Sequence, residues 1–493
     1  MKYGLKCGVF ALAMSSTIAA ADTLQVAVAQ SPAGLDPHVA TAFSSALIYQ
    51  NIYEGLVALD ADLSVQPALA ESWTITDDGR TYVFKLRQGV TFHNGDAFDS
   101  EDVVGSFDRV RDKETGSPIA SRFSLIEDVT AGGSHEVTIR LSAPFAPMLS
   151  QLAGLYIVPG GGAAGDLQRE PVGTGPFKLT EWVPDTYLHL DAHDGYWESG
   201  LPKLQSVRFS IVPEASTRQI GLVTGTYHLL PNVDSATALT LAADPNAVVL
   251  ETADMAYSLI GVNVTQPPFD NPKVREAFNY GINRQEIIEA ALFGKGEPAG
   301  PLPQVLAQSL PTSQYPCYQH DSEKAKALLA ESGADSAITI KVLGTVQQVV
   351  DIAQVVQAQL NQSGFQVDLD IQELGQFVQD WKNSNFTAFA SLNRGNPDPD
   401  GYMYRAFYTG GSTNVFGYSN TQIDGWLDEA RTETDAGKRK SIYGDIQRVL
   451  ACEGPIVHIA FAGLFTVVRP EVQGFQQSPD RSLRSLRQTS LAN

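Results

Sequence analysis

The stretch LAESWTITDDGRTYVFKLRQGVTFHNGDAF, residues 69–98, decides the first part of the fold. Its central side chains alternate in character, and the apolar members are Tyr82, Phe84 and Leu86. Turn-forming residues bracket this run at 77–79 (Asp-Asp-Gly) and at 93–95 (His-Asn-Gly). Alternation with a period of two between turn signals is typical of half-buried antiparallel strands. The pattern by itself therefore predicts a β-meander.

The order of residues in and around this stretch also follows a known family. The stretch opens with Ala-Glu-Ser-Trp at 70–73 and closes with Phe-His-Asn-Gly-Asp at 92–96. Three more blocks of the same family character follow the expected order: Leu-Asp-Pro-His at 35–38, Gly-Thr-Gly-Pro-Phe at 173–177, and Asn-Val-Thr-Gln-Pro-Pro-Phe-Asp-Asn-Pro-Lys-Val-Arg at 263–275. Together they span nearly the whole chain. The chain thus resembles the family 5 solute-binding proteins of ABC transporters, which include peptide-, nickel- and opine-binding proteins.

This resemblance implies an α/β, two-lobed periplasmic-binding-protein fold of type II, cluster C, with an extra β-rich domain. Length alone also predicts two or three domains, because 493 residues exceed what one hydrophobic core usually supports. By analogy with the family, we place lobe I at residues 22–64, 177–260 and 474–493. The β-rich domain II is placed at 65–176 and lobe III at 261–473.

Residues 1–21 have the features of a cleavable secretory signal peptide. Lys2 and Lys6 precede an apolar run, and Ala19-Ala20-Ala21 ends it before Asp22. The alternative is a buried N-terminal helix, but the run is too short to span a bilayer and ends in small residues. Cys7 lies at the start of the apolar segment, not at its end, where a lipid-modified cysteine is needed. The sequence therefore predicts a soluble periplasmic protein.

The charge balance argues against nucleic acid or an anionic membrane surface as a partner. The formal net charge is −21, and loss of residues 1–21 removes two lysines and no acid, which gives −23. No later segment has the uninterrupted apolar length of a transmembrane helix. Any membrane contact is expected to go through a protein partner.

Two cysteines, Cys317 and Cys452, remain after the signal segment. Export places them in an oxidising compartment, so we predict a disulfide between them. Closing so long a loop contributes on the order of 4 to 5 kcal/mol in the loop-entropy model. The alternative is two separate buried thiols, because sequence does not show their distance.

The clearest local patterns lie in lobe III. Asn271 with Pro272, and Asn283 with Glu286, are typical helix starts, and a further helix is expected from Asp321 to Gly333. Apolar residues alternate at 338–342 and again at 365–371, with a helical segment between them. Strand, helix and strand in this spacing predict a parallel right-handed crossover. A buried strand is expected at 387–392.

The segment after that strand, residues 393–400, is the candidate ligand site, because open α/β sheets bind ligands beyond the carboxyl ends of their strands. In the peptide-binding relatives a carboxylate at this strand end holds the ligand's amino terminus, and here that position is Gly395. Beside it, the guanidinium of Arg394 can donate two parallel hydrogen bonds to a carboxylate or phosphate. The alternative is an ion pair of Arg394 with Asp398 or Asp400. Asn393 and Asn396 are expected to add hydrogen bonds.

The resemblance and the aromatic content suggest further cleft residues. Tyr404 and Trp426 are candidates for stacking on the ligand, although core packing explains many of the aromatic residues nearby. Asp36 and His38 follow the first strand and are placed by the resemblance on the opposite wall of the cleft. The alternative for them is a capped turn.

Motifs for catalysis, metals and cofactors are weak. Gly160 to Gly165 satisfies G-x-G-x-x-G, but Pro159 interrupts the turn and no periodic helix follows, so a glycine loop is favoured over a phosphate cradle. His189 and His193 lie in a strand-like run, where residues four apart are well separated. No catalytic triad, metal set or nucleotide motif has a suitable context. We therefore expect no cofactor, no metal and no enzymatic activity.

The function expected from the sequence is that of a periplasmic, monomeric receptor that closes over a small solute and docks on an inner-membrane ABC permease. By the resemblance, a short peptide or peptide-like compound is the first choice of ligand. Arg394 favours the alternative of an opine, a glutathione-like compound or another anionic amino-acid conjugate, and oligosaccharides also occur in the family. The competing classes are an exported hydrolase and a receptor for larger chains.

Overall fold

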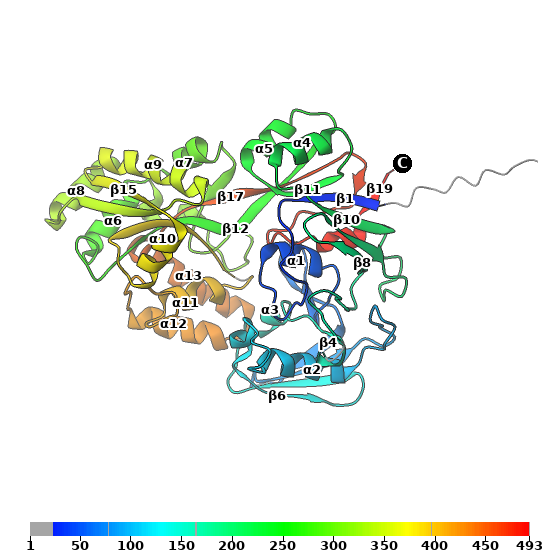
Figure 1. Ribbon diagram of the computed structural model, residues 1–493. Helices are drawn as coiled ribbons and strands as arrows, with labels where there is room; N and C mark the ends of the chain where they lie inside the picture. Colours follow the sequence, from blue (N-terminus) through cyan, green and yellow to red (C-terminus); the bar gives the residue numbers. More distant parts are fainter. Residues whose placement is uncertain (1–22, 77, 163–164, 396, 493) are drawn as a thin grey trace, which may run out of the picture.

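A computed structural model describes residues 23–76, 78–162, 165–395 and 397–492 (Figure 1). The chain forms two lobes, with a smaller β-rich part below lobe I in the view of Figure 1. The predicted signal segment lies outside the described residues. Within the described ranges, no helix has the length and apolar character needed to cross a membrane.

One 11-stranded sheet runs through the two lobes in the order β15-β14-β16-β12-β17-β11-β1-β10-β9-β8, with the short β13 (Gly296–Pro298) on β17. The long antiparallel strands β12 (Val248–Val262) and β17 (Ile456–Val468) pass from one lobe to the other (Figure 1). The remaining strands on the lobe I side are β1 (Thr23–Val28), β8 (Phe177–Val183), β9 (Tyr187–Ala192), β10 (Ser206–Ile211) and β11 (Leu229–Val233). On the lobe III side they are β14 (Ala337–Leu343), β15 (Gln366–Gln372) and β16 (Ala388–Arg394).

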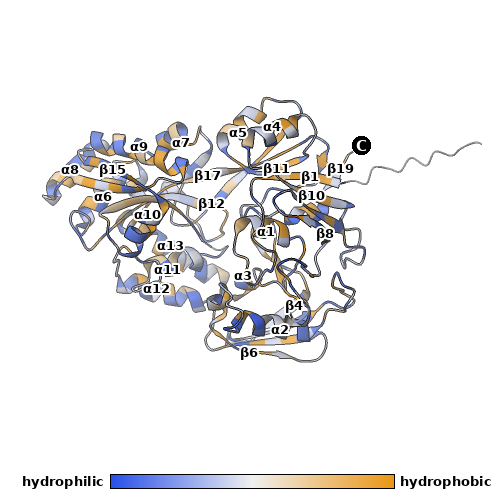
Figure 2. Ribbon diagram, in the orientation of Figure 1, coloured by the Kyte–Doolittle hydropathy of each residue, from blue (hydrophilic) through white to orange (hydrophobic). Residues whose placement is uncertain are grey.

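Helices cover the two faces of the sheet in lobe III. One face carries α6 (Pro272–Tyr280), α7 (Arg284–Ala291), α8 (Ser322–Ser332) and α9 (Gln347–Gln362). The other carries α10 (Leu374–Lys382), α11 (Asp400–Phe407), α12 (Thr421–Thr432) and α13 (Ala436–Glu453) (Figure 1). Lobe I has α1 (Phe43–Tyr49), α4 (Ala215–Val223) and α5 (Ser235–Leu241). Separate apolar clusters fill the two faces of lobe III, and Figure 2 shows hydrophobic residues along the strands of the sheet.

The β-rich part contains the predicted antiparallel strands, in an order that the sequence did not give. Its sheet runs β4 (Ala70–Ile75), β5 (Thr81–Leu86), β7 (Glu136–Leu141), β6 (Ile126–Ala131), all antiparallel. The quoted stretch supplies only the β4–β5 hairpin, because the third strand in space is β7. Helices α2 (Ser100–Arg111) and α3 (Met148–Leu152) and the small hairpin β2 (Val57–Leu59) with β3 (Val65–Pro67) complete this part. The buried residues of its apolar core lie between positions 56 and 157. The domain boundaries expected from the sequence remain predictions.

The local predictions in lobe III are confirmed with one change. Asn271 caps α6, Pro272 occupies its first turn, and the strands β14 and β15 are parallel in a register from Ala337–Gln366 to Leu343–Gln372. Asn283 accepts a hydrogen bond from the Glu286 backbone N–H, but the return bond expected of Glu286 is absent from α7 as described. Gln359 of α9 takes its place, since its Oε1 accepts from the Asn283 N–H at 3.0 Å and its Nε2 donates to Glu286.

The predicted disulfide is confirmed, with Cys317 and Cys452 joined in lobe III. Cys452 lies in the last turn of α13, and Cys317 lies in a short 3-10 helix, Pro316–Tyr318. The bond therefore ties the end of α13 to the segment that precedes α8.

Candidate functional site

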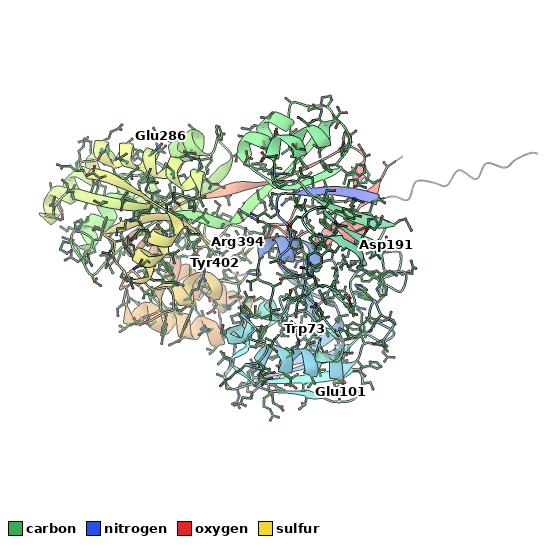
Figure 3. The ribbon with its side chains drawn as sticks, in the orientation of Figure 1. Trp73, Glu101, Asp191, Glu286, Arg394 and Tyr402 are labelled. Carbon is green, nitrogen blue, oxygen red and sulfur yellow. A yellow bond between two sulfur atoms is a disulfide. The ribbon has the colours of Figure 1, made fainter. Side chains whose placement is uncertain are left out.

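The end of strand β16 brings Arg394 to the boundary between the lobes. An Arg394 Nη atom lies 2.5 Å from Oδ1 of Asp254 on β12, and neither Asp398 nor Asp400 is its partner. Arg481, from the C-terminal segment on the lobe I side, pairs with the other oxygen of Asp254. Figure 3 shows Arg394 on the side of lobe III that faces lobe I. One carboxylate on a connecting strand thus holds two guanidinium groups that come from different lobes.

A β-bulge gives Asp254 its position. The pairing of β12 with β17 shifts register between Ala253 and Tyr257, so residues 254–256 lie outside the regular ladder. A bulge bends a strand and re-aims its side chains. The shift lies where β12 leaves the lobe I half of the sheet and begins to pair with β16, from Ala256 opposite Arg394. The carboxylate of Asp254 therefore lies at the joint between the lobes.

A third guanidinium, that of Arg405 on α11, lies beside Arg394. It donates at 2.9 Å to Oδ1 of Asn393 and at 2.9 Å to the backbone oxygen of Arg394. No ion pair joins Arg405 to any residue that the structure describes, and its buried Nε has no hydrogen-bond partner there. We call the group of Arg394, Arg405, Arg481 and Asp254 the cationic centre. It contains three guanidinium groups and one carboxylate, in a chain whose net charge is −21.

Gly395, the position where the resemblance to peptide-binding relatives implied a carboxylate, follows Arg394, the last residue of β16. A Cβ atom at Gly395 would lie 2.4 Å from the Tyr402 ring, which is too close for any other residue without movement. Tyr402 is fully buried and its hydroxyl donates to the backbone oxygen of Met255 at 2.9 Å. The aromatic ring on α11 therefore occupies the space that a side chain at position 395 would need. Asn396 lies outside the described residues.

An apolar pocket of about 290 Å³ adjoins the cationic centre. It is lined by α10, by the end of β16 and by the loop before α12, and Asn393 and Arg405 belong to its lining. The side chain of Asn393 donates to the Tyr257 hydroxyl at 3.0 Å and accepts from Arg405. Arg405 also lines a second, polar pocket of about 510 Å³, which includes Tyr404, Tyr408 and Gln151.

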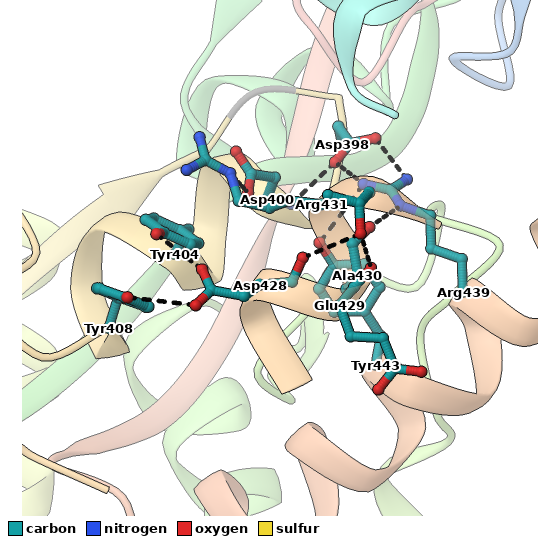
Figure 4. A network of polar contacts seen from close by, with 11 residues as sticks. Asp398, Asp400, Tyr404, Tyr408, Asp428, Glu429, Ala430, Arg431, Arg439 and Tyr443 are labelled. Atoms are coloured by element: carbon teal, nitrogen blue, oxygen red, sulfur yellow. Dashed lines mark hydrogen bonds and ion pairs between the residues drawn. The ribbon is translucent and has the colours of Figure 1, made fainter. Parts of the chain in front are cut away.

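The acids of the 393–400 segment take part in a buried network (Figure 4). Asp398 accepts two hydrogen bonds from Arg439 at 2.7 and 2.8 Å, and each of these residues is 7% exposed. Asp400 pairs with Arg431 at 2.9 Å, and burial raises the pKa of its carboxyl to about 6. We call these four residues the buried network. It joins α11, α12 and α13, so Asp398 and Asp400 have structural ion-pair partners within lobe III.

Tyr404 and Trp426 have different surroundings. Tyr404 stacks on Tyr408 with ring centres 4.4 Å apart, donates to Asp428 and lies under the Arg431 guanidinium (Figure 4). Trp426 is half-buried on α12, packs against the lobe III core and lines neither pocket. Ligand stacking by Tyr404 or Trp426 stays a prediction.

Asp36 and His38 are almost fully buried, at 3% and 1% exposure. Asp36 pairs with Arg109 of α2, and the His38 ring contacts Arg109 and the backbone oxygen of Tyr156 at 2.8 Å. Burial, followed by the nearby Arg109 charge, lowers the pKa of His38 to about 4. These contacts attach the segment after β1 to the β-rich part, and we do not include Asp36 or His38 in the proposed ligand site.

The other sequence motifs have local partners. The Gly160 N–H donates to Oδ1 of Asp102 at 2.7 Å. A carboxylate of the protein therefore takes the N–H group that a phosphate would need in this glycine segment. His189 contacts Asp191 within β9, whereas His193 lies against the His93 ring. The described residues contain no group of three or more His, Cys, Asp or Glu side chains placed to hold a metal ion.

Comparison with known proteins identifies the family. A family model described as bacterial extracellular solute-binding proteins, family 5, matches residues 64–414. The glutathione-binding protein GsiB of Pectobacterium atrosepticum is 30% identical over 494 residues, which cover 96% of this chain and 95% of the relative. The chain belongs to the family 5 bacterial extracellular solute-binding proteins. The resemblance inferred from residues 69–98 and the later blocks is thereby confirmed.

Solved structures agree with this assignment. HbpA2 from Haemophilus parasuis superposes with a TM-score of 0.87 at 27% identity, over 96% of this chain and all of that one. DppA from Helicobacter pylori, solved with the peptide STSA, has a TM-score of 0.77 at 26% identity, over 96% and 98% of the two chains. The predicted two-lobed α/β fold is confirmed. As a member of family 5, this protein is the solute-binding component of an ABC importer.

Proposed function

We propose that this family 5 protein captures a small peptide-like solute with a free carboxylate at the cationic centre and delivers it to an inner-membrane ABC permease. The protein acts as a non-enzymatic, monomeric periplasmic receptor, after export through a cleavable signal at residues 1–21. The observation that carries the ligand class is the surplus of guanidinium groups over carboxylates at residues 254, 394, 405 and 481.

Charge balance supports an anionic ligand group. Two guanidinium groups share the one carboxylate of Asp254, and Arg405 has only neutral acceptors among the described residues. The side chains of Arg394 and Arg481 are each 32% exposed, so a ligand can reach them. A guanidinium binds a carboxylate through two parallel hydrogen bonds, which are stronger than neutral ones. A ligand carboxylate would supply the acceptors that the protein does not.

The same centre favours one class of peptide ligand. Gly395 offers no carboxylate for a ligand ammonium, so recognition of the anionic end is favoured over recognition of the amino terminus. The relative named for glutathione binding fits this chemistry, because glutathione is a tripeptide with two carboxylates. AgaA, solved with agropinic acid at 25% identity and a TM-score of 0.76, supports an opine as the second candidate.

The first test is to purify the protein under native conditions and identify by mass spectrometry any small molecule released on unfolding. A released peptide or conjugate with a free carboxylate is the expected result, and a stoichiometric neutral sugar would contradict the proposal. Calorimetric titration of the released compound then compares Arg405→Gln with the matched control Arg448→Gln. Arg448 is exposed on α13, and Asp445 is its only ion-pair partner among the residues that the structure describes. We expect at least a tenfold loss of affinity for Arg405→Gln and none for the control.

A further inference from the structure

The pocket beside the cationic centre is lined mainly by apolar side chains. Phe377, Val378 and Trp381 of α10 line it, together with Phe389 and Phe416. The exposed fractions of two more lining residues, Leu374 and Leu392, are 52% and 38%. Large apolar side chains held open around a pocket expose carbon to water, and such surfaces mark ligand sites.

The polar residues of this pocket connect it to the cationic centre. Asn393 and Arg405 line the pocket, and Arg405 also donates to the backbone oxygen of Arg394. A carboxylate bound to Arg405 would therefore lie at the polar side of an apolar pocket. A substituent on the carbon next to that carboxylate has carbon-lined space directly available.

We propose that this pocket receives the apolar side chain that adjoins the ligand carboxylate. The preferred substrate class is then a short peptide or amino-acid conjugate whose carboxyl-terminal residue carries an aromatic or branched aliphatic side chain. This inference rests on the proposed function, because it takes the carboxylate on Arg405 as its starting point. Burying such a side chain is expected to improve affinity about ten- to a hundredfold over alanine at the same position.

The experiment compares three probes on the ligand-free full-length mature protein by calorimetric titration. The probes are Ala-Ala-Phe, Ala-Ala-Ala and the carboxamide of Ala-Ala-Phe. We expect Ala-Ala-Phe to bind at least tenfold more tightly than Ala-Ala-Ala, and the carboxamide to bind at least tenfold more weakly than Ala-Ala-Phe. Equal affinity for Ala-Ala-Phe and Ala-Ala-Ala would overturn the pocket assignment and leave the proposed function standing. Failure of the two free-acid peptides to bind would overturn both proposals.

Two variants on the same helix locate the effect. Val378→Trp places a ring in the pocket and should reduce the affinity for Ala-Ala-Phe to that for Ala-Ala-Ala. Gln379→Trp changes an exposed position on α10 that does not line the pocket, so it should keep the wild-type ratio of the two affinities. An unchanged ratio in Val378→Trp would contradict the assignment.

A spectroscopic readout does not depend on whether Val378→Trp folds. Trp381 lines the pocket, so its fluorescence should shift when Ala-Ala-Phe binds to the wild-type protein and shift less with Ala-Ala-Ala. The difference should disappear in Trp381→Phe. A shift that Trp381→Phe retains in full would place the phenyl group elsewhere.

Discussion

The cationic centre and the buried network are two arginine–carboxylate clusters with opposite charge balance. In the buried network, Asp398 faces Arg439 and Asp400 faces Arg431, one acid for each base. In the cationic centre, Arg394 and Arg481 share the single carboxylate of Asp254, and Arg405 donates only to neutral acceptors among the described residues. The buried network joins helices within lobe III, whereas the cationic centre lies between lobes and remains one-third exposed at Arg394 and Arg481.

The difference separates structural arginines from arginines available to a ligand. Burying a charge is costly unless a partner matches it, so a buried pair that already matches has little left to offer a ligand. A partly exposed guanidinium that no carboxylate fully neutralises stays partly hydrated. It can exchange bound water for an acceptor on the ligand. Residue type alone does not distinguish the two roles, since each cluster contains the same side chains.

Removal of the disulfide should have the largest effect on stability. Cys452 lies in the last turn of α13, the helix that carries Arg439 of the buried network. The double substitution Cys317→Ala with Cys452→Ala should lower the free energy of unfolding by about 4 to 5 kcal/mol, because a loop of 135 residues is no longer closed in the unfolded chain. Denaturant unfolding checks this, and ligand affinity of the folded variant should stay near that of the wild type. If the fully folded double variant lost much of its ligand affinity, the disulfide would also be needed for the geometry of the cationic centre.

Breaking the buried network comes next. Asp398→Asn leaves the buried Arg439 guanidinium without its ion-pair partner and should cost about 3 to 5 kcal/mol of unfolding free energy. Asp445→Asn, which breaks the exposed pair with Arg448, is the matched control and should cost less than about 1 kcal/mol. Replacing Asp398 and Arg439 together by Leu and Met should recover most of the loss. Similar costs for Asp398→Asn and Asp445→Asn would remove the distinction between buried and exposed pairs.

In the cationic centre the main effect should be on binding. Arg394→Ala leaves Asp254 paired with Arg481, so the unfolding free energy should change by less than about 1 kcal/mol. Affinity for the natural ligand should fall well over tenfold, because a charge-assisted hydrogen bond is lost. Titration and denaturant unfolding on the same variant give the two numbers. Unchanged affinity would exclude Arg394 from the ligand site.

Salt should separate the two clusters further. Raising the ionic strength from about 0.05 to 0.5 M shortens the screening length several-fold, which weakens attraction between a half-exposed guanidinium and an approaching anion. We expect ligand affinity to fall roughly threefold or more. The destabilisation caused by Asp398→Asn should hardly change, because buried pairs are screened little. Salt-independent binding would indicate a ligand that is neutral where it meets the centre.

The last prediction is a pH dependence of stability that comes from Asp400. Burial raises the pKa of its carboxyl from 3.8 to about 6, so the folded chain holds this proton more tightly than the unfolded chain does. Its contribution to unfolding free energy therefore falls as pH rises from about 4 to about 6, and stays low above that. Asp400→Asn removes this slope. The difference in unfolding free energy, variant minus wild type, should therefore become more positive as the pH rises from about 4 to about 7. Denaturant unfolding at the two pH values measures the change, and a relative loss of stability would contradict the pKa direction.

The parts of the fold that were predictable depend on neighbours close in sequence. The caps of α6 and α7 and the alternation in β5, β14 and β15 follow from residues within a few positions of one another. The position of β7 beside β5 did not follow, because any antiparallel strand with the same alternation could have paired there. The disulfide was predictable only because two cysteines remain after the signal segment.

The candidate site was predictable in part for the same reason. Arg394 was found from its place at a strand end, but Asp254 is 140 residues away and Arg481 is 227 residues from Asp254. No local signal marks Arg405, whose importance lies in having no acid beside it in the described structure. The alternative pairing of Arg394 with Asp398 or Asp400 does not form, because Arg439 and Arg431, from α13 and α12, pair with those carboxylates.

The sequence by itself determined the family, the class of fold, the cysteine pair and the strand end that carries Arg394, because periodicity, capping and motif order are local properties of the chain. Tertiary structure alone decided which arginines are matched by acids and which are not. That balance depends on charges brought together across three helices in the buried network and across a β-bulge at the joint of the lobes in the cationic centre. Coulombic pairing depends on distance in space, and distance in space between residues far apart in sequence is fixed only when the chain folds.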